Sequence, residues 1–293
     1  MGRSDEHISL QIGTKDLIDF QVCKDISGWD SDLLRFGLVH PYQTTAFAEF
    51  CKINGYRVDF INITKGDRVI GKCCVHINDR VARWFYGPVV LPDFLCDYSL
   101  IVDGFIRFLS SRGVICIKDS TTQTIYEKDF FLNRFPQYSG DYETPYVDLE
   151  SNVDEIYKNF ASSLRKNVRK CREANVYVEI SNAPSLLEVY LGMLRYYRRY
   201  LGFSMPQFYP NPDSMRFFSR PHIGMYVAVA WLEEVPLAGL GIVTFGRLVI
   251  EVAVAQSYEY HLHNLPANEF IKVKVIDHFR ENGLKVYDLS GIR

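Results

Sequence analysis

The same order of strand-like and helix-like segments occurs twice along this chain, and this repetition constrains the fold more than any other feature. In the C-terminal half, three β-rich runs precede a helix that begins at Pro266, and a short strand follows the helix. The strand-like runs of this half are residues 223–232, 236–245, 248–255 and 285–292. The N-terminal half repeats the order with strands at 57–64, 69–77 and 82–90, a helix at 97–112 and a strand at 114–118. A repeated β-β-β-α-β unit predicts two similar domains, each with its own sheet.

The 293 residues are enough for two domains of roughly 100–200 residues, each with a stable core. A polar, glycine-containing stretch at residues 138–143 separates the two copies, so we expect domains at 1–143 and 144–293. The remaining expected elements are strands at 19–24, 146–149 and 176–180, helices at 32–36, 44–53, 153–174 and 184–201, and an irregular loop with at most one helical turn at 202–222.

Composition and charge exclude several classes of protein. Hydrophobic residues make up 47% of the chain and charged residues 23%, as in an ordinary globular protein. The net charge of −2 means that any contact with nucleic acid or an anionic membrane must come from a local patch. The seven cysteines form no CxxC pair, which favours buried reduced thiols over disulfides or a metal site. We find neither a signal peptide nor an apolar run of about 20 residues, and therefore expect a soluble, cytoplasmic protein without a transmembrane segment.

A basic segment dominates the helix expected at 153–174. Six cations and no acid lie between residues 158 and 172. On a helix, Arg165, Arg169 and Arg172 share one face, and Lys166 and Lys170 share a neighbouring one. Such like charges repel, so either a polyanion such as phosphate or RNA compensates them, or acids elsewhere in the fold do.

Two further segments are candidates for binding. The run 195–200, Arg-Tyr-Tyr-Arg-Arg-Tyr, closes the next helix and could stack on bases or bind phosphate; alternatively, its cations complement the helix dipole. The helix start Pro266-Ala-Asn-Glu-Phe follows a strand, and free N–H groups there attract anions, although Pro266 also fits simple helix initiation.

Glu251 is an acid within an apolar strand. It is either a structural carboxylate with an internal partner or a general base that faces the cleft.

The common phosphate, zinc, serine-hydrolase and dinucleotide signatures are absent from the sequence. It contains no GxxxxGK[ST], HExxH, GxSxG or GxGxxG. The histidines are scattered, and His261 with His263 lacks an obvious third ligand, so no metal site is expected.

Five segments in a fixed order over about 250 residues carry a resemblance to a known family. They are Tyr42-Gln-Thr with Phe47, the run 84–90 with Tyr-Gly-Pro, Tyr146-Val-Asp-Leu, the basic run 164–174 and Tyr287-Asp-Leu-Ser-Gly-Ile. In this order the chain resembles the Fem-type (FemABX) aminoacyltransferases, within the broader set of GNAT-like acyltransferase folds. The resemblance implies an α/β (α+β) protein of two tandem GNAT-like domains, with mixed sheets flanked by helices and a shared cleft.

The resemblance also implies an activity. It is transfer of an acyl or aminoacyl group to an amine acceptor, without metal, tightly bound cofactor or covalent enzyme intermediate. The best-known members use aminoacyl-tRNA and a peptidoglycan precursor, and other relatives use acyl-CoA. The glycine-containing pyrophosphate loop of CoA users is not found in residues 255–265, so both donors stay open. A cell-envelope acceptor would imply peripheral contact with a membrane-linked substrate.

Three hypotheses follow for function. In the first, an N-acyltransferase or aminoacyltransferase holds donor against amine, with Glu251 or Asp288 as catalytic proton acceptor. Its substrate-binding candidates are Arg165, Lys166, Arg169, Tyr197, Tyr200, Tyr258 and Asn268. In the second, the fold is a non-catalytic module that binds nucleic acid or a nucleotide-linked glycan; it is favoured because the sequence ends at Arg293, before the family's Phe-Lys segment. The third is a purely structural protein.

Overall fold

The computed structural model describes residues 17–117, 145–205 and 209–290 of the chain. The chain divides into two compact units, Met1–Asp141 and Tyr142–Arg293, called unit 1 and unit 2. The boundary expected between residues 143 and 144 lies outside the described residues. Each unit has its own sheet and its own hydrophobic core.

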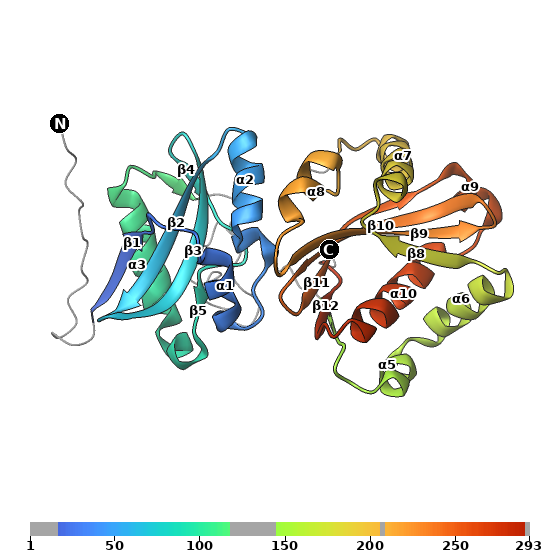
Figure 1. The fold of residues 1–293 in the computed structure, drawn as a ribbon, viewed down its shortest axis with the longest axis horizontal. Coiled ribbons are helices and arrows are strands. Elements are labelled where there is room, and N and C mark those ends of the chain that lie inside the picture. Colours follow the sequence, from blue (N-terminus) through green and yellow to red (C-terminus); the bar gives the residue numbers. More distant parts are fainter. Residues whose placement is uncertain (1–16, 118–144, 206–208, 291–293) are drawn as a thin grey trace. The chain divides into compact units, whose positions relative to one another are not determined.

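Unit 1 is a six-stranded mixed sheet in the order β1-β2-β3-β4-β6, with β5 paired to β3. Among the described strands of unit 1, only the β4–β6 pair is parallel. Figure 1 shows α3 on one face of this sheet and α1 and α2 on the other. The elements are β1 Ile18–Val22, α1 Trp29–Leu33, η1 Leu34–Phe36, η2 Pro41–Gln43, α2 Thr45–Ile53, β2 Arg57–Lys65, β3 Arg68–Asn78, β4 Val81–Arg83, β5 Val89–Val90, η3 Pro92–Asp97, α3 Tyr98–Ser111 and β6 Cys116–Ile117.

The core of unit 1 follows from the sequence pattern of α3. Ile101, Phe105 and Phe108 recur at helical spacing and are buried against the sheet. Phe20 of β1 packs against the rings of Phe105 and Phe108, at centroid distances of 6.0 and 5.8 Å. This packing fixes α3 on the sheet.

The prediction of a single strand at residues 82–90 is wrong, because the structure has two short strands there, β4 and β5. The backbone leaves β4 after Arg83, passes Tyr86 at a φ of 54°, and resumes as β5. Pro88 has no N–H to donate to a ladder, and a left-handed residue cannot continue a strand. The expected strand is therefore interrupted after Arg83, and β4 and β5 pair antiparallel with two separate stretches of β3.

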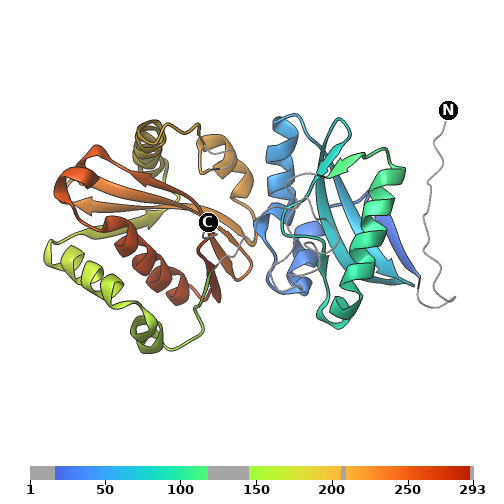
Figure 2. The same ribbon diagram turned by 180° about the vertical axis from the view of Figure 1, so that it is seen from behind.

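Unit 2 is also a six-stranded mixed sheet, in the order β7-β12-β11-β10-β9-β8. The β11–β12 pair is its one parallel pair within the described ranges. Helices α5, α6 and α10 cover one face, and α7 and α8 cover the other (Figures 1 and 2). The elements are β7 Tyr146–Asp148, α5 Val153–Asn159, α6 Ser162–Glu173, β8 Tyr177–Ser181, α7 Pro184–Tyr200, α8 Pro212–Phe218, β9 Ile223–Leu232, β10 Val235–Phe245, β11 Leu248–Gln256, α9 Tyr258–His263, α10 Ala267–Glu281 and β12 Val286–Asp288.

The prediction of one long helix at 153–174 is wrong, because the structure has two helices there, α5 and α6. Phe160 and Ala161 have extended ψ angles of 140° and 147°, which end α5 before α6 begins. The Arg165 guanidinium donates to the carbonyls of Lys158 and Phe160, at 2.9 and 2.6 Å. These bonds satisfy carbonyl groups at the end of α5 and stabilise the break.

The segment at 202–222 also contains more helix than expected. Helix α8 has seven residues, about two turns rather than one. Asn211 caps it, since its side chain accepts from the Ser214 N–H while the Ser214 hydroxyl accepts from the Asn211 N–H. The stretch after β11 contains a further short helix, α9, that the sequence pattern did not predict.

The predicted repeat is confirmed in its order of elements. Unit 1 runs β2-β3-β4-α3-β6 and unit 2 runs β9-β10-β11-α10-β12, and in each unit the last strand pairs in parallel with the third. No helix within the described ranges is both long and apolar enough to cross a membrane.

Candidate functional site

The strands β12 and β11, second and third in the unit 2 sheet, stop pairing before β11 ends. β12 pairs with β11 at three positions, the last being Asp288 opposite Ile250, while β11 continues to Gln256. On its other side, β11 has a bulge. Glu251 pairs with Ile242 and Ala253 with Gly241, so that Val252 is an extra residue. A bulge bends its strand and removes backbone groups from the ladder, which is a common arrangement beside active sites.

A group of polar side chains lies where this pairing ends. We call Glu251, Lys272, Tyr287, Asp288 and Ser290 the Glu251 cluster. Lys272 Nζ lies 2.7 Å from Glu251 Oε2, and the Tyr287 hydroxyl donates to Oε1. The Ser290 hydroxyl donates to the Glu251 carbonyl, and its N–H donates to Asp288 Oδ1 at 2.8 Å. The cluster thus joins β11, β12 and α10.

Burial governs the acid–base chemistry of this cluster. Glu251 is 6% exposed and Asp288 is 2% exposed. Burial raises the pKa of Glu251, whereas Lys272 and the Tyr287 hydroxyl bond lower it and the nearby Asp288 charge raises it. The pKa of Tyr287 is well above its ordinary value because the hydroxyl is buried and lies against the Glu251 carboxylate.

The sequence leaves open whether Glu251 is a structural carboxylate or a general base. A structural carboxylate requires an internal partner, and Lys272 and Tyr287 are such partners. A carboxylate with a raised pKa is also suited to accept a proton near neutral pH, so the role as a base stays a prediction. Lys272 is 35% exposed at its side chain and is the member of the pair that reaches solvent.

The predicted cations on α6 have different surroundings. Arg165 bonds to the carbonyls that end α5, while Arg169 lies 3.7 Å from Glu173 with both side chains about 70% exposed. Lys170 donates to the Asn264 carbonyl at 2.7 Å. Lys166 is exposed. Lys170 is thus the cation of α6 that contacts the loop between α9 and α10.

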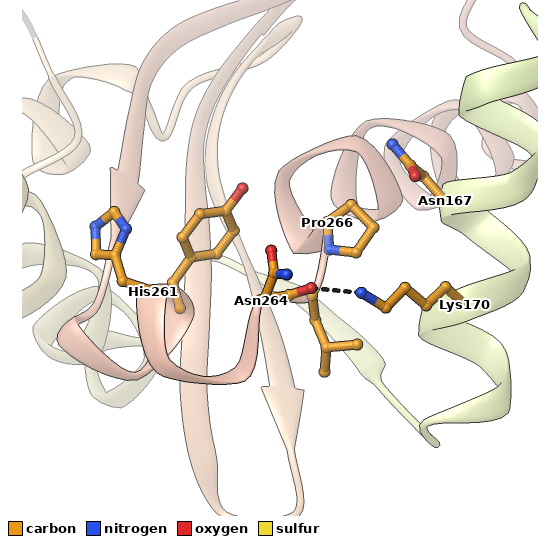
Figure 3. Close-up of a pocket in the computed structure, with 7 residues that line it drawn as sticks. Asn167, Lys170, His261, Asn264 and Pro266 are labelled. Carbon is orange, nitrogen blue, oxygen red and sulfur yellow. Dashed lines mark hydrogen bonds between the residues drawn. The ribbon is translucent and has the colours of Figure 1, made fainter.

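A polar pocket of about 330 Å³ lies between α6, α9 and the start of α10 (Figure 3). Figure 3 shows Lys170 reaching from α6 to the Asn264 carbonyl across this pocket. It is lined by Asn167, Lys170, Tyr260, His261, Asn264, Leu265 and Pro266.

The start of α10 gives this pocket an anion-binding character. Pro266 is the N-cap residue of this 15-residue helix, and no side chain caps the helix start. Uncapped N–H groups and the helix dipole favour a negative charge at this end. Against this, Asn268 Oδ1 and Glu269 Oε2 are buried without hydrogen-bond partners among the described residues, and both are acceptors that disfavour an anion. The Glu269 carboxylate lies close enough to contribute, after burial, to the raised pKa of Tyr260, and so partly offsets the Lys170 charge.

The predicted tyrosines meet beside the pocket. Tyr200 of α7 lies against His261 of α9, with ring centroids 4.9 Å apart. Tyr196 contacts both Tyr200 and Tyr258, at 6.2 and 6.4 Å. Tyr197 is near Tyr260, whose pKa it helps to raise.

The predicted site residues thus fall into two groups. Glu251 and Asp288 lie together in the Glu251 cluster, while Lys166, Tyr200, Tyr258 and the remaining substrate-binding candidates lie on α6, α7, α9 or the start of α10. Sequence reasoning missed Lys272, Tyr287, Tyr260, His261 and Asn264 as site residues. One feature of the sequence could have predicted a partner such as Lys272. Glu251 lies inside an apolar strand, and a buried acid requires a cation or hydrogen-bond donor from a neighbouring element.

No group of three or more histidine, cysteine or acidic side chains in the described ranges could hold a metal ion. The sequence matches no protein-family model, and no match is found among curated proteins.

Solved structures resemble the chain over most of its length. FemX aligns with 92% of this chain and 88% of its own, at 14% identity and a TM-score of 0.70. The C-terminal domain of a lysylphosphatidylglycerol synthetase from Agrobacterium fabrum covers 89% of this chain and 77% of its own, at 14% identity and a TM-score of 0.55. A tandem GNAT protein from the clavulanic acid pathway covers 92% and 89%, at 11% identity and a TM-score of 0.50.

The chain has the Fem and tandem GNAT fold. The predicted fold class, two tandem GNAT-like domains with mixed sheets flanked by helices, is confirmed. At these identities the similarity establishes the fold, and the chemistry has to be argued from the residues of this chain.

Proposed function

We propose that unit 2 transfers an acyl or aminoacyl group from an activated donor to an amine. The observation that carries this proposal is the Glu251 cluster at the point where β11 and β12 separate. A buried carboxylate with a raised pKa there lies in the same unit as a polar pocket at a helix start. The fold shared with FemX and a tandem GNAT protein supports the same conclusion.

The chemistry needs a proton acceptor and a site for a developing oxyanion. The amine nitrogen attacks the donor carbonyl, a C–N bond forms, and the C–O bond of an ester or the C–S bond of a thioester breaks. Glu251 accepts the amine proton, and the leaving oxygen or sulfur takes up a proton in turn. Val252 is the extra residue of the bulge, and we assign its backbone N–H as the donor that stabilises the oxyanion.

Both candidate donors, aminoacyl-tRNA and acyl-CoA, carry phosphates. The start of α10 and Lys170 offer such a group N–H donors and a cation. The acceptor is an amine, for which a peptidoglycan or other cell-envelope precursor is the leading class. One neighbour in fold is named for lysylphosphatidylglycerol synthesis, so an amine or hydroxyl acceptor on a membrane-linked substrate belongs in the same test.

The test is a turnover assay of the purified full chain. Charged tRNAs and acyl-CoAs are supplied with amine acceptors, and acylated products are detected by mass spectrometry. We expect transfer from one donor class, and a loss of about 100-fold or more in Glu251→Gln, which keeps the side-chain shape but cannot accept the proton. Glu150→Gln is the matched control, because Glu150 also pairs with a lysine, Lys285, but is 57% exposed and lies outside the cluster.

Two results would contradict the proposal. The first is full activity in Glu251→Gln. The second is salt-dependent binding of tRNA or a nucleotide-linked glycan without turnover for any donor, which would support the non-catalytic binding module instead.

A further inference from the structure

We propose that the end of α7 and the helix α9 form a surface that docks on an anionic lipid bilayer. Its apolar members are Tyr200, Leu201, Phe203, Tyr258 and Leu262. Together with the three arginines between residues 195 and 199, we call them the docking surface. Lipid binding by this surface does not depend on the proposed function, because it involves no transfer step.

Exposed apolar side chains are concentrated at this surface. Of the eleven large apolar side chains that are exposed in the described part of the chain, five lie in the short segments 200–203 and 258–262. The other six come from six different segments. The segments 200–203 and 258–262 are adjacent in space, since the Tyr200 ring lies 4.9 Å from the His261 ring. Such a cluster marks an interaction surface, whereas single exposed apolar residues need no explanation.

The turn after α7 holds Phe203 in an ordered but exposed position. The Phe203 N–H donates to the Arg198 carbonyl at 2.9 Å, and the Gly202 N–H donates to the Arg199 carbonyl at 3.0 Å. Gly202 has a φ of 69°, so the helix ends in a Schellman motif with glycine at its left-handed position. The Phe203 ring lies 5.0 Å from the Arg198 guanidinium and stays 58% exposed. A ring that is already ordered can enter an apolar phase with little further loss of conformational entropy.

Helix α9 is also ordered without being buried. None of its six residues is buried. Ser257 caps its start by accepting a backbone N–H of the first turn at 3.1 Å, and Lys170 donates to the carbonyl of Asn264, the C-cap residue. Tyr258 and Leu262 are four residues apart and share one face of the helix, where Leu262 is 62% exposed. Hydrogen bonds at both ends, rather than core packing, therefore hold a helix whose apolar side chains stay exposed.

The charge of the docking surface favours an anionic partner. Arg195 and Arg199 are exposed and lie four residues apart on one face of α7, and no acid occurs between residues 195 and 205. Within the described ranges, neither they nor Arg198 form an ion pair with an acid. Glu259 is the one acid of α9. Anionic lipid headgroups would therefore compensate cations that no acid of the described residues compensates.

The aliphatic members favour a bilayer over a nucleic acid or a second copy of the chain. Leu201 and Leu262 offer no ring on which a base could stack and no polar group for a phosphate. A bilayer accepts the whole set, because phenyl and aliphatic groups enter the acyl boundary, tyrosines suit the headgroup level and arginines attract lipid phosphate. A two-fold contact between copies would instead bring the same arginines face to face.

The test is flotation of the purified full chain with vesicles of phosphatidylcholine alone or mixed with phosphatidylglycerol. We expect binding to the anionic vesicles only, with an affinity that falls as salt is added. Phe203→Ser and Leu262→Ser should each weaken binding about tenfold, because each removes a side chain that enters the apolar phase. Arg195→Gln combined with Arg199→Gln should weaken binding about 20-fold and reduce its salt dependence.

Matched substitutions in unit 1 control for exposed apolar area and for charge. Ile53→Ser removes an aliphatic side chain that is 64% exposed at the end of α2. Arg35→Gln combined with Arg107→Gln removes two exposed cations. Each control should change vesicle affinity by less than about twofold. Thermal melts check that all variants fold, as surface substitutions should allow.

Insertion into the bilayer is measured separately from adsorption. In Phe203→Trp, the added indole should be quenched by lipids with brominated acyl chains, beyond the quenching of the three native tryptophans in the wild type. A protein that only adsorbs to the headgroups by charge would show no added quenching.

Each outcome decides the proposal. It is overturned if neither kind of vesicle binds, if the docking-surface variants bind like the wild type, or if Phe203→Trp shows no added quenching. Without vesicle binding, an RNA hairpin whose binding these variants weaken would assign the surface to nucleic acid, and a dimer lost in Leu262→Ser would assign it to a second copy. Either result also overturns the proposal. Because no transfer is measured, intact vesicle binding with a failed turnover assay would overturn the proposed function alone.

Discussion

The two units repeat one order of elements but bury opposite members of an ion pair. In unit 1, Lys72 of β3 is 5% exposed at its side chain and lies 2.8 Å from Asp32, which is 49% exposed. In unit 2, Glu251 of β11 is 6% exposed and lies 2.7 Å from Lys272, which is 35% exposed. Unit 1 thus fixes a cation in its interior, whereas unit 2 keeps an acid inside and lets the cation reach water.

The two units also differ in the length of the third strand of the repeat, which is β4 in unit 1 and β11 in unit 2. In unit 1, β4 has three residues, and after an interruption the chain continues as β5, which pairs antiparallel with β3 as β4 does. In unit 2, β11 has nine residues and continues past the last pair with β12. The extra length and the bulge at Val252 give unit 2 a polar site at its strand separation, while Lys72 in unit 1 packs over the Trp29 ring at 4.4 Å. The comparison teaches that one topology can hold either a packed lysine or an acid suited to proton transfer.

Removing the lysine of each pair tests this contrast most strongly. Lys272→Met leaves Glu251 buried without its cation, so we expect a loss of about 3–5 kcal/mol in the free energy of unfolding at pH 8. Because the pKa of Glu251 is already raised and rises further without Lys272, the loss should shrink as the pH falls and the acid takes up a proton. Urea unfolding at pH 8 and pH 5.5 measures both effects.

Lys72→Met is the matched change in unit 1. Asp32 is half exposed and can be hydrated after the change, so the expected loss is about 1 kcal/mol or less. Equal losses in the two variants, or a Lys272→Met loss that does not depend on pH, would contradict the assignment of opposite buried partners.

Acid should affect unit 1 through its buried histidines. Burial lowers the pKa of His76 to about 4 and holds that of His40 well below its ordinary value. The unfolded chain binds protons near pH 6.5 while the folded unit does not, so stability falls as the pH drops from about 6.5 to about 4. His76 alone would contribute about 3 kcal/mol over this window.

Hydrogen exchange of β3 peptides, followed by mass spectrometry from pH 7 to pH 4.5, measures this effect after correction for intrinsic exchange rates. His76→Phe should reduce the pH dependence, whereas His263→Ala, a change at an exposed histidine of unit 2, should leave it unaltered. An unchanged profile in His76→Phe would show that other groups control the acid response.

Gln43 links two segments of unit 1 that are far apart in sequence. Its buried amide donates to the Phe85 carbonyl at 2.5 Å and accepts from the Cys74 N–H at 2.8 Å. Gln43→Leu leaves those backbone groups unsatisfied, and we expect a loss of about 2 kcal/mol in urea unfolding. Glu188→Leu, at an exposed position of α7, should change stability by less than about 0.5 kcal/mol.

The smallest effect is expected at the break between α5 and α6. Arg165→Ala removes two hydrogen bonds to backbone carbonyls and should cost about 1 kcal/mol, because the side chain is exposed and water can replace them. Arg169→Ala removes only a long, exposed ion pair with Glu173 and should cost less than about 0.5 kcal/mol. If Arg165→Ala is instead neutral in stability and weakens donor binding, Arg165 belongs to the substrate-binding surface.

Local pattern predicted the elements well wherever side-chain periodicity decided them. The span of β9 agrees with the expected strand, and α7 ends one residue before the expected helix end, because apolar spacing along each segment matches the burial it acquires. The failures lie where side-chain hydrogen bonds to the backbone decide, whether from a near residue or a distant one. Arg165 stabilises the break after α5, and the two hydrogen bonds of Gln43 join η2 to β3 and to the turn before β5.

The sequence by itself determined the repeated order of elements, the basic face of α6 and the unusual acid at Glu251, because each depends on residues a few positions apart. The tertiary structure alone decided that Glu251 pairs with Lys272 and Tyr287, which lie 21 and 36 residues away. It also decided that the tyrosines of α7 meet those of α9 beside a pocket. A site is a set of distances between elements, and periodicity within one element carries no information on which residues of another element it will face.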